Sequence, residues 1–362
     1  MSFDYAGRVE RLRGAMESVG VDVTLLSVGA DLPYFTGYEA RPSERLTVLV
    51  LPTGGDPILF VPLLEAPGVE VGPFEVRSWS ETDDPVDLAA SVVDDPGRVA
   101  VGDHMWAIFL TRFQSLWRET EWVPASELTS ELRLRKESGE IDLLRRAARG
   151  VDRVMERIPG ELTFAGRVER EVARDLAELT IGEGHESAEF TIVASGPNGA
   201  SPHHHPGDRV IEEEDLVVCD FGGRLNGYYS DSTRTFVVGE PSEEQREVHE
   251  VVLAANEAGR AAVAPRVTCE AIDAAARSVI DEAGFGEYFV HRTGHGIGLE
   301  VHEHPYIVSG NELPLDPGMT FSVEPGIYLP GQFGVRIEDI VVCTGDGAES
   351  LNESERALVS VS

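Results

Sequence analysis

Cysteine is scarce in this sequence of 362 residues, which contains only Cys219, Cys269 and Cys343. Three widely separated thiols are too few for a disulfide framework, which argues against a small secreted scaffold. Apolar runs of about 18 residues or more, the length that a membrane span needs, are also absent. The first residues lack the basic segment and apolar stretch of a secretory signal. We therefore expect a cytoplasmic protein without membrane contact.

Lysine is almost absent, because Lys136 is the only lysine among 30 basic residues. Aspartate and glutamate together number 64, and the formal net charge is −34. One interpretation is an acidic surface for basic partners, but the acidic residues are spread along the whole chain. We favour adaptation to molar salt, where the Debye length falls to about 3 Å and charge repulsion is screened. Such a surface disfavours nucleic acid as a partner.

The first part of the chain alternates short apolar runs with helical patterns. The apolar runs predict strands at 21–28, 46–51, 58–61 and 98–101. The periodic segments predict helices at 9–19, 86–93 and 105–117. Together they indicate a small α/β domain with a mostly covered sheet. The polar stretch near 130–138 ends this pattern, and we place the two domains at 1–135 and 136–362.

The second part repeats one order of elements, two helices followed by strands. In its first half, helices are predicted at 139–158 and 164–179, and strands at 190–194, 216–221 and 228–238. In its second half, helices are predicted at 242–263 and 269–283, and strands at 320–324 and 335–344. This repetition predicts an α+β domain with a pseudo-two-fold repeat.

Two aspartates occupy neighbouring strands that are predicted to form a hairpin. Asp220 ends the apolar run LVVC, and Asp231 lies in the next strand after the turn-like Gly-Arg-Leu-Asn-Gly. Two carboxylates at close range repel each other, and a metal ion would neutralise both. Alternatively, the aspartates serve turns or pair with an arginine such as Arg234.

Three further residues share this character of a polar group on a strand or a glycine-rich turn. His295 lies between glycines, Glu324 ends the run TFSV, and Glu338 lies in VRIEDIVV. Alternatively, His295 has a structural role, and Glu338 pairs with Arg336 on the same face of its strand. Four carboxylates and one imidazole form an oxygen-rich set that suits Mn²⁺, Co²⁺ or Zn²⁺. The set is large enough for two ions with bridging carboxylates.

Six stretches of the second domain match one known family. They are 195–203 (SGPNGASPH), 220–223 (DFGG), 230–236 (SDSTRTF), 294–303 (GHGIGLEVHE), 323–328 (VEPGIY) and 334–339 (GVRIED). With these stretches the chain resembles the pita-bread metallopeptidases, and among them the Xaa-Pro peptidases, proline dipeptidase and aminopeptidase P. The resemblance extends from about Ser138 to the end, and more loosely to the first domain, which is similar to the family's N-terminal α/β domain.

The resemblance implies a role for each metal ligand. It places Asp220 on one ion, His295 and Glu324 on the other, and Asp231 and Glu338 between both. It further implies a homodimer that acts on short proline-containing peptides.

The resemblance also implies catalytic and substrate-binding groups. Glu324 would transfer protons, while His203 and His302 would bind substrate and stabilise the oxyanion. His291 is a further candidate for substrate binding. His204 and His205 have no counterpart in the family, and we expect them to lie in a solvated loop.

One position departs from the family pattern. Many dipeptidases of the family carry an arginine shortly after the His-Glu pair, which is expected to hold the substrate carboxylate. Here Tyr306 stands near that place and is itself a candidate for substrate binding. Arg336, or Arg41 and Arg45 from a partner subunit, are the candidate substitutes. Dipeptidase stays the favoured activity and aminopeptidase P the alternative.

Other readings keep the fold but change the function. A creatinase-like hydrolase or a non-catalytic binding protein with this fold would lack the metal ligands, and all five are present here. Methionine aminopeptidase shares the catalytic fold but usually lacks such an N-terminal domain.

Overall fold

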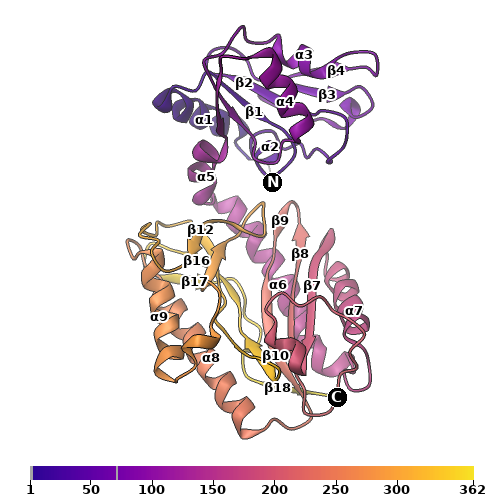
Figure 1. The fold of residues 1–362 in the computed structure, drawn as a ribbon, viewed down its shortest axis with the longest axis vertical. Helices are drawn as coiled ribbons and strands as arrows, with labels where there is room; N and C mark the ends of the chain where they lie inside the picture. Colours follow the sequence, from indigo (N-terminus) through magenta and orange to yellow (C-terminus); the bar gives the residue numbers. More distant parts are fainter. Residues whose placement is uncertain (1–2, 71) are drawn as a thin grey trace. The chain divides into compact units, whose positions relative to one another are not determined.

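The computed structural model describes residues 3–70 and 72–362, and the chain divides into two compact units after Arg133 (Figure 1). Each unit has its own sheets and helices and is considered by itself. Within the described residues, no helix has both the length and the apolar character that a bilayer crossing requires.

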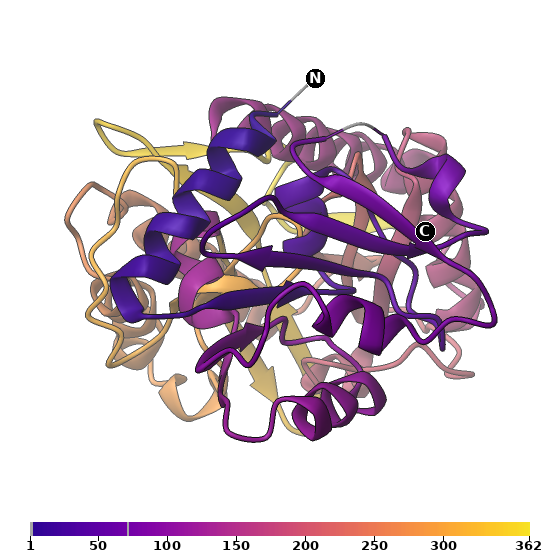
Figure 2. The ribbon, with the colours of Figure 1, turned by 90° about the horizontal axis from the view of Figure 1, so that it is seen from above.

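The N-terminal unit is built on a six-stranded sheet in the order β4-β3-β2-β1-β5-β6. Its strands are β1 (Val23–Leu26), β2 (Val48–Pro52), β3 (Ile58–Pro62), β4 (Glu75–Trp79), β5 (Arg98–Val101) and β6 (Glu121–Pro124). Its helices are α1 (Tyr5–Val19), α2 (Asp31–Thr36), α3 (Pro85–Ala90), α4 (Ala107–Leu116) and α5 (Ser126–Leu134). Figure 2 shows α1 along one face of this sheet and the α3–α4 region along the other.

Continuous apolar runs along the central strands explain why this sheet is covered on both faces, since every residue of β1, β2 and β3 is buried. Val23 and Leu25 of β1 and Val50 of β2 share a buried cluster with Phe109 and Phe113 of α4. The expected strands and helices of this unit are present, but strands β4 and β6 and helices α2 and α5 were not predicted. Four of the five residues of β4 are exposed, so this edge strand carries no apolar signal.

The first half of the C-terminal unit places two helices on a sheet in the order β18-β10-β8-β7. The helices are α6 (Ser138–Glu161) and α7 (Glu169–Gly182). The strands are β7 (Ser187–Ser195), β8 (Leu216–Leu225), β9 (Tyr228–Tyr229), β10 (Ser232–Val238) and β18 (Val359–Val361), with β9 paired to β8. Val151 and Leu176 from the helices are buried against Val193 and Val217 from the strands.

The second half repeats this arrangement with a sheet in the order β12-β11-β13-β16-β17. Its helices are α8 (Glu243–Ala261) and α9 (Cys269–Glu282). Its strands are β11 (Gly294–Gly296), β12 (Glu303–Ile307), β13 (Thr320–Val323), β16 (Asp339–Cys343) and β17 (Ala348–Ser350). A separate ribbon pairs β14 (Gly326–Leu329) with β15 (Phe333–Arg336).

The two halves turn their helices outward. Figure 1 shows α6 and α7 on one side of the C-terminal unit and α8 and α9 on the other, with the sheets between them. Ile272 of α9 packs on Phe321 and Val341 of the second sheet, as Leu176 of α7 packs on the first. The predicted α+β fold with an internal repeat is confirmed, and the sheet faces between the helix pairs are left for a site.

Two strands that were predicted as continuous are interrupted. The expected strand 228–238 breaks between β9 and β10 at Ser230 and Asp231, and 335–344 breaks between β15 and β16 at Ile337 and Glu338. An apolar pattern does not reveal such breaks, because the flanking residues alternate normally. Each break leaves one acidic residue, Asp231 or Glu338, outside the regular hydrogen bonding of the sheet.

Helix α7 also begins later than expected, at Glu169 in place of residue 164. The amide nitrogens of Phe164 and Ala165 donate to the carbonyl of Ser362, so they do not form the hydrogen bonds of a first helical turn. Val168 forms an isolated bridge with Val210.

A fully buried aspartate joins β10, β16 and the C-terminal segment. Asp339 has no exposed surface and accepts hydrogen bonds from Arg234 and Arg356, while Arg260 lies 3.6 Å away. Burial would raise the pKa of this carboxyl, but the three arginines hold it below its usual value.

Replacing Asp339 by asparagine should therefore leave buried guanidinium groups without their counter-charge. We expect Asp339→Asn to lower the free energy of unfolding by about 3–5 kcal/mol, measured by urea denaturation of the metal-free protein. Asp142, which pairs with Arg145 at the surface, is the matched control. Asp142→Asn should cost less than about 1 kcal/mol. Equal losses in the two variants would contradict the assigned role of the buried network.

Candidate metal centre

A tight turn brings the two aspartates of the first half together. Leu225 pairs with Tyr228, and the two residues between them, Asn226 and Gly227, have φ values of 50° and 85°. Positive φ at both positions is the requirement of a type I′ hairpin turn. The chain then returns along β8 as β10, with Thr233 opposite Asp220. The predicted hairpin is thus present.

The second half supplies its ligand candidates from three adjacent strands. Glu324 directly follows β13 and Glu338 directly precedes β16, and these strands pair with Val323 opposite Asp339. His295 lies in β11, whose Gly296 is opposite Phe321 of β13. A Cβ at Gly294 would lie 1.8 Å from the carbonyl oxygen of Ser322, so glycine is needed for this close approach.

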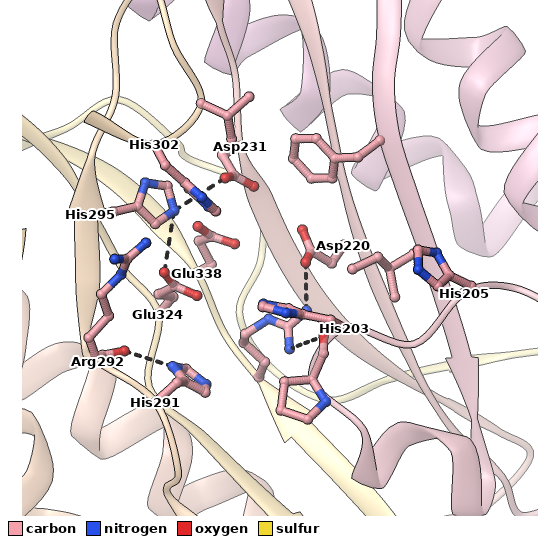
Figure 3. Close-up of a pocket in the computed structure, with 15 residues that line it drawn as sticks. His203, His205, Asp220, Asp231, His291, Arg292, His295, His302, Glu324 and Glu338 are labelled. Atoms are coloured by element: carbon pink, nitrogen blue, oxygen red, sulfur yellow. Dashed lines mark hydrogen bonds and ion pairs between the residues drawn. The ribbon is translucent and has the colours of Figure 1, made fainter. Parts of the chain in front are cut away.

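The five residues meet in one cavity of about 820 Å³. Figure 3 shows Asp220 and Asp231 on the wall opposite His295 and Glu324, with Glu338 between them. The Nε2 atom of His295 lies 3.6 Å from Asp231 Oδ2 and 3.4 Å from Glu324 Oε1. Asp231, His295 and Glu338 each offer one donor atom, and these three atoms lie within 4.8 Å of one another.

The imidazole of His295 is oriented to offer a lone pair. Its Nδ1 lies 3.1 Å from the carbonyl oxygen of Gly296, which can only accept, so Nδ1 carries the proton. Nε2 is then unprotonated and faces the carboxylates, which is the tautomer that a metal ligand needs. Burial, and then the neighbouring His302, lower the pKa of His295 to about 3, so the ring stays neutral.

The carboxylates are in an unfavourable state when no cation is present. Burial first, and then the charges of the other carboxylates, raise the pKa values of Asp231 and Glu338 well above normal. Burial also raises the pKa of Glu324 to about 7. Within the described chain, Asp220 Oδ1 and Glu338 Oε1 are buried without a hydrogen-bond partner. Divalent cations would remove the repulsion and occupy these oxygens, so the residues fit a metal centre.

Six other polar side chains line the same cavity. They are His203, His205, His291, Arg292, His302 and Arg336. His203, His205 and His302 are exposed, and the His302 ring lies 4.1 Å from the His295 ring between centroids. Phe190, Ile192, Pro202 and Val301 give the cavity an apolar wall. Burial and then the charge of Arg292 lower the pKa of His302.

Arg336 lines the cavity but is fully engaged. Its guanidinium donates to Asp220 Oδ2 (2.5 Å), Thr233 Oγ1 (3.1 Å), the carbonyl of Pro202 (3.3 Å) and the Tyr328 hydroxyl (2.8 Å). The side chain is only 3 % exposed, so it has little freedom to turn toward a ligand. The alternative Arg336–Glu338 pairing is not formed, because Arg336 binds Asp220.

His291 also lines the cavity with both ring nitrogens occupied. Nδ1 lies 2.7 Å from the carbonyl of Arg292, and Nε2 lies 2.8 Å from the Tyr328 hydroxyl. Since that hydroxyl accepts from Arg336, it is free to donate to His291, and the three side chains form one chain of hydrogen bonds. Burial lowers the pKa of His291 to about 4.

Tyr306 does not line the cavity itself. It lies opposite His295 in the β11–β12 pair, and the guanidinium of Arg292 lies 4.5 Å from the centre of its ring. Arg292 was not selected from the sequence, because an arginine beside His291 gives no indication of its direction. Its stacking on a residue fourteen positions away becomes visible only in the structure.

The loop that carries His203 is fixed by a buried glutamate that the sequence did not reveal. Glu169 at the start of α7 has no exposed surface. It accepts hydrogen bonds from the amide and hydroxyl of Ser195, the side chain of Asn198 and the amide of Gly207. His204 Nε2 lies 2.7 Å from its second oxygen. His204 is therefore an anchor of this loop rather than a solvated side chain, whereas His205 is exposed as expected.

The chain's only lysine supports the neighbouring turn. Lys136 Nζ lies 2.8 Å from Glu303 Oε1, with side-chain exposures of 1 % and 8 %. A Cβ at Gly298 would lie 2.6 Å from that same glutamate oxygen, so glycine leaves room for the pair. The pair holds Glu303 directly beside His302.

Comparison with known proteins identifies the family. Residues 142–345 match Metallopeptidase family M24, and residues 8–135 match the Creatinase/Prolidase N-terminal domain. This chain belongs to metallopeptidase family M24. Its structural neighbours with known fold confirm the pita-bread catalytic domain, and divalent metal ions are the cofactors of such an enzyme.

Relatives of this M24 peptidase match over nearly the whole chain. The "Probable dipeptidase PepE" of Mycobacterium tuberculosis is 46 % identical over 365 residues, covering 99 % of this chain and 96 % of the relative. A "Xaa-Pro dipeptidase" of Lactobacillus helveticus is 37 % identical, covering 97 % and 98 %. The crystal structure of a prolidase from Thermococcus sibiricus is 38 % identical and superimposes with a TM-score of 0.95, each chain being fully covered.

Metal binding should stabilise this peptidase more strongly as pH rises. Without cations, a raised carboxyl pKa means that the folded chain binds more protons than the unfolded one, so stability falls between pH 4.5 and about 7 for Glu324. Cations replace those protons and remove this loss. The increase in melting temperature on adding Mn²⁺ should therefore grow from pH 5 to pH 7.

Differential scanning fluorimetry at pH 5, 6 and 7, with and without Mn²⁺, measures this effect. Glu338→Gln, which removes one charge of the cluster, should show a smaller gain at pH 7. A gain in melting temperature that is the same at all three pH values would contradict the assigned centre.

Proposed function

We propose that this chain is a Xaa-Pro dipeptidase that hydrolyses the peptide bond before proline with the help of two divalent cations. The observation that carries the proposal is the convergence of three buried carboxylates, one half-buried carboxylate and one imidazole in a cavity of about 820 Å³. That volume accommodates a ligand the size of a dipeptide. The printed names of the relatives, PepE dipeptidase and Xaa-Pro dipeptidase, support the same activity.

We assign the five ligands as the family resemblance suggests. Asp220 would hold one ion, His295 and Glu324 the other, and Asp231 and Glu338 both. The short separation of donor atoms from Asp231, His295 and Glu338 supports this division. When bound, the two cations supply Lewis acidity and lower the pKa of water between them. The catalytic domain is proposed to span 136–362, after an N-terminal domain at 1–135.

Glu324 is the proposed group for proton transfer. Burial raises its pKa to about 7 in the metal-free chain, and its Oε1 accepts a hydrogen bond from Ser322 at 3.2 Å. It would take a proton from the attacking water and deliver it to the leaving prolyl nitrogen. His203 and His302 stand exposed at the cavity and would donate to the developing oxyanion.

The bond before proline is a tertiary amide and lacks an N–H group. An enzyme that selects it must recognise the ring and the charged ends of the substrate. Phe190, Ile192 and Val301 offer an apolar wall for the ring. His291, with both nitrogens engaged, is proposed to hold Tyr328 and Arg336 in place and not to bind substrate directly.

An aminopeptidase P activity is the alternative, because the same metal centre would serve it. The two activities differ in whether the cavity holds the free C-terminus of a dipeptide or the continuing chain of a longer peptide. A non-catalytic binding protein is disfavoured, since retained acidic ligands with raised pKa values cost stability without a cation.

The first test compares hydrolysis of Xaa-Pro, Xaa-Pro-Yaa and Met-Ala-Xaa peptides in molar KCl with Mn²⁺ or Co²⁺. We expect Xaa-Pro to be the best substrate. Asp231→Asn should lower kcat/KM by more than about 100-fold, because mutating a residue that merely supports a metal ligand already lowers activity by up to about 100-fold. The same variant should bind fewer than two equivalents of metal. Asp142→Asn, at the surface, should change neither quantity. A fully active Asp231→Asn enzyme with two bound metals would refute the ligand assignment.

We also propose that the acidic surface adapts the chain to molar salt. The support is the charge of −34 and the near absence of lysine. The melting temperature should rise by at least about 5 °C between 0.2 M and 3 M KCl, because screening relieves repulsion between carboxylates. Sucrose at equal osmolality is the control. A melting temperature that does not respond to KCl would refute the proposal.

Three further expectations from the sequence stay predictions. They are the homodimer, the identity of the metal (Mn²⁺ or Co²⁺, with Zn²⁺ as the alternative), and the cytoplasmic location.

A further inference from the structure

The free carboxylate of a dipeptide needs a cationic partner in a site that is rich in acid. Four carboxylates already surround this cavity, and the chain as a whole carries a charge of −34. An anionic group entering such a site is repelled unless a fixed positive charge lies close to it. Among the residues that line the cavity, the permanent cations are Arg292 and Arg336.

Arg336 is already used by the protein. It forms an ion pair with Asp220 and donates to three further oxygens, one of them on the His203 loop at Pro202. Turning it toward a substrate would remove the buried hydrogen bond that it donates to Asp220 Oδ2, which is costly. Its position therefore serves the architecture of the metal centre.

Arg292 differs from Arg336 in forming no direct ion pair or side-chain hydrogen bond within the described residues. Its guanidinium stacks on the ring of Tyr306, and its charge acts on nearby Glu324, where it lowers the pKa. Figure 3 shows its side chain reaching toward His295 and Glu324. A half-buried guanidinium that forms no direct ion pair is unusual in a chain with 64 acidic residues. Its N–H donors are therefore available to an anionic ligand in the cavity.

Tyr306 orients the guanidinium of Arg292. Its ring lies 4.5 Å from the guanidinium carbon, a stacking contact that fixes the plane of the group without using its N–H donors. Tyr306 is itself positioned opposite His295 in the β11–β12 pair. The stacked arginine is thereby set at a fixed place relative to the strand that carries a metal ligand.

We propose that Arg292, oriented by Tyr306, binds the C-terminal carboxylate of the substrate and makes the enzyme selective for dipeptides. This inference rests on the proposed function. A planar guanidinium binds a carboxylate through two parallel hydrogen bonds. A longer peptide would present a neutral amide at the same place and leave the buried charge of Arg292 unpaired.

The test uses Ala-Pro, its C-terminal amide Ala-Pro-NH₂ and the tripeptide Ala-Pro-Ala as substrates. The wild-type enzyme should prefer Ala-Pro to the amide by about 100-fold in kcat/KM, as expected when a charged pair is lost. Arg292→Met should lower kcat/KM for Ala-Pro by about 100-fold and change the value for the amide by less than about threefold. Arg292→Lys should recover part of the loss, because it keeps the charge but not the fork.

Two further variants keep the test informative if Arg292→Met folds poorly. Tyr306→Leu removes the stacking ring and should raise KM for Ala-Pro several-fold, whereas Tyr306→Phe retains the ring and should not. Arg266→Met, at an arginine that is 78 % exposed, is the matched control and should leave the dipeptide preference unchanged. Metal content should stay at two equivalents in every variant.

The outcomes separate this inference from the proposed function. If Arg292→Met loses activity equally on all three substrates, Arg292 acts in the chemistry or the fold, and the carboxylate assignment is wrong while the dipeptidase proposal stands. If the wild-type enzyme cleaves none of the three peptides, both proposals are overturned together.

Discussion

Repulsion between buried carboxylates is the constraint on which this structure depends. Buried Asp231 and Glu338 and half-buried Glu324 line one cavity, and their raised pKa values show that holding these carboxylates together destabilises the folded chain when no cation is bound. Hydrophobic packing behind them makes this possible, since helix pairs α6–α7 and α8–α9 cover the outer faces of both sheets. The repeat thus supplies two similar walls, and each wall contributes acids to a shared charge cluster.

The cationic neighbours divide their roles around this cluster. Arg336 neutralises Asp220 from the protein side and is held by Tyr328 and Thr233. Arg292 forms no direct ion pair among the residues described and stacks on Tyr306. Arginine suits both tasks, because its guanidinium stays charged and can hold several acceptors at once. One arginine therefore maintains the site, and the other is available to a substrate.

Some of the residues proposed as metal ligands could be selected from the sequence because they lie where an apolar run meets a polar group. Asp220 after LVVC and Glu324 after TFSV are such places, and the hairpin geometry of Asn226 and Gly227 follows from residue type. Strand breaks at Asp231 and Glu338 were not foreseen, since they depend on tertiary contacts between the two halves. Glu169 and Arg292 were missed for the same reason: their partners lie 35 and 14 residues away, and periodicity carries no record of such pairs.

The Lys136–Glu303 pair has a consequence for how the enzyme responds to its ionic environment. Ions in the solvent screen exposed charges strongly but act far less on a pair with exposures of 1 % and 8 %. Glu169, which holds the loop that carries His203, has no exposed surface and is shielded as well. The charged residues that hold His302 and His203 in place are thus little affected by ions in the solvent. A change in salt concentration can therefore alter the stability of the whole chain while the distances between the groups around the substrate stay the same.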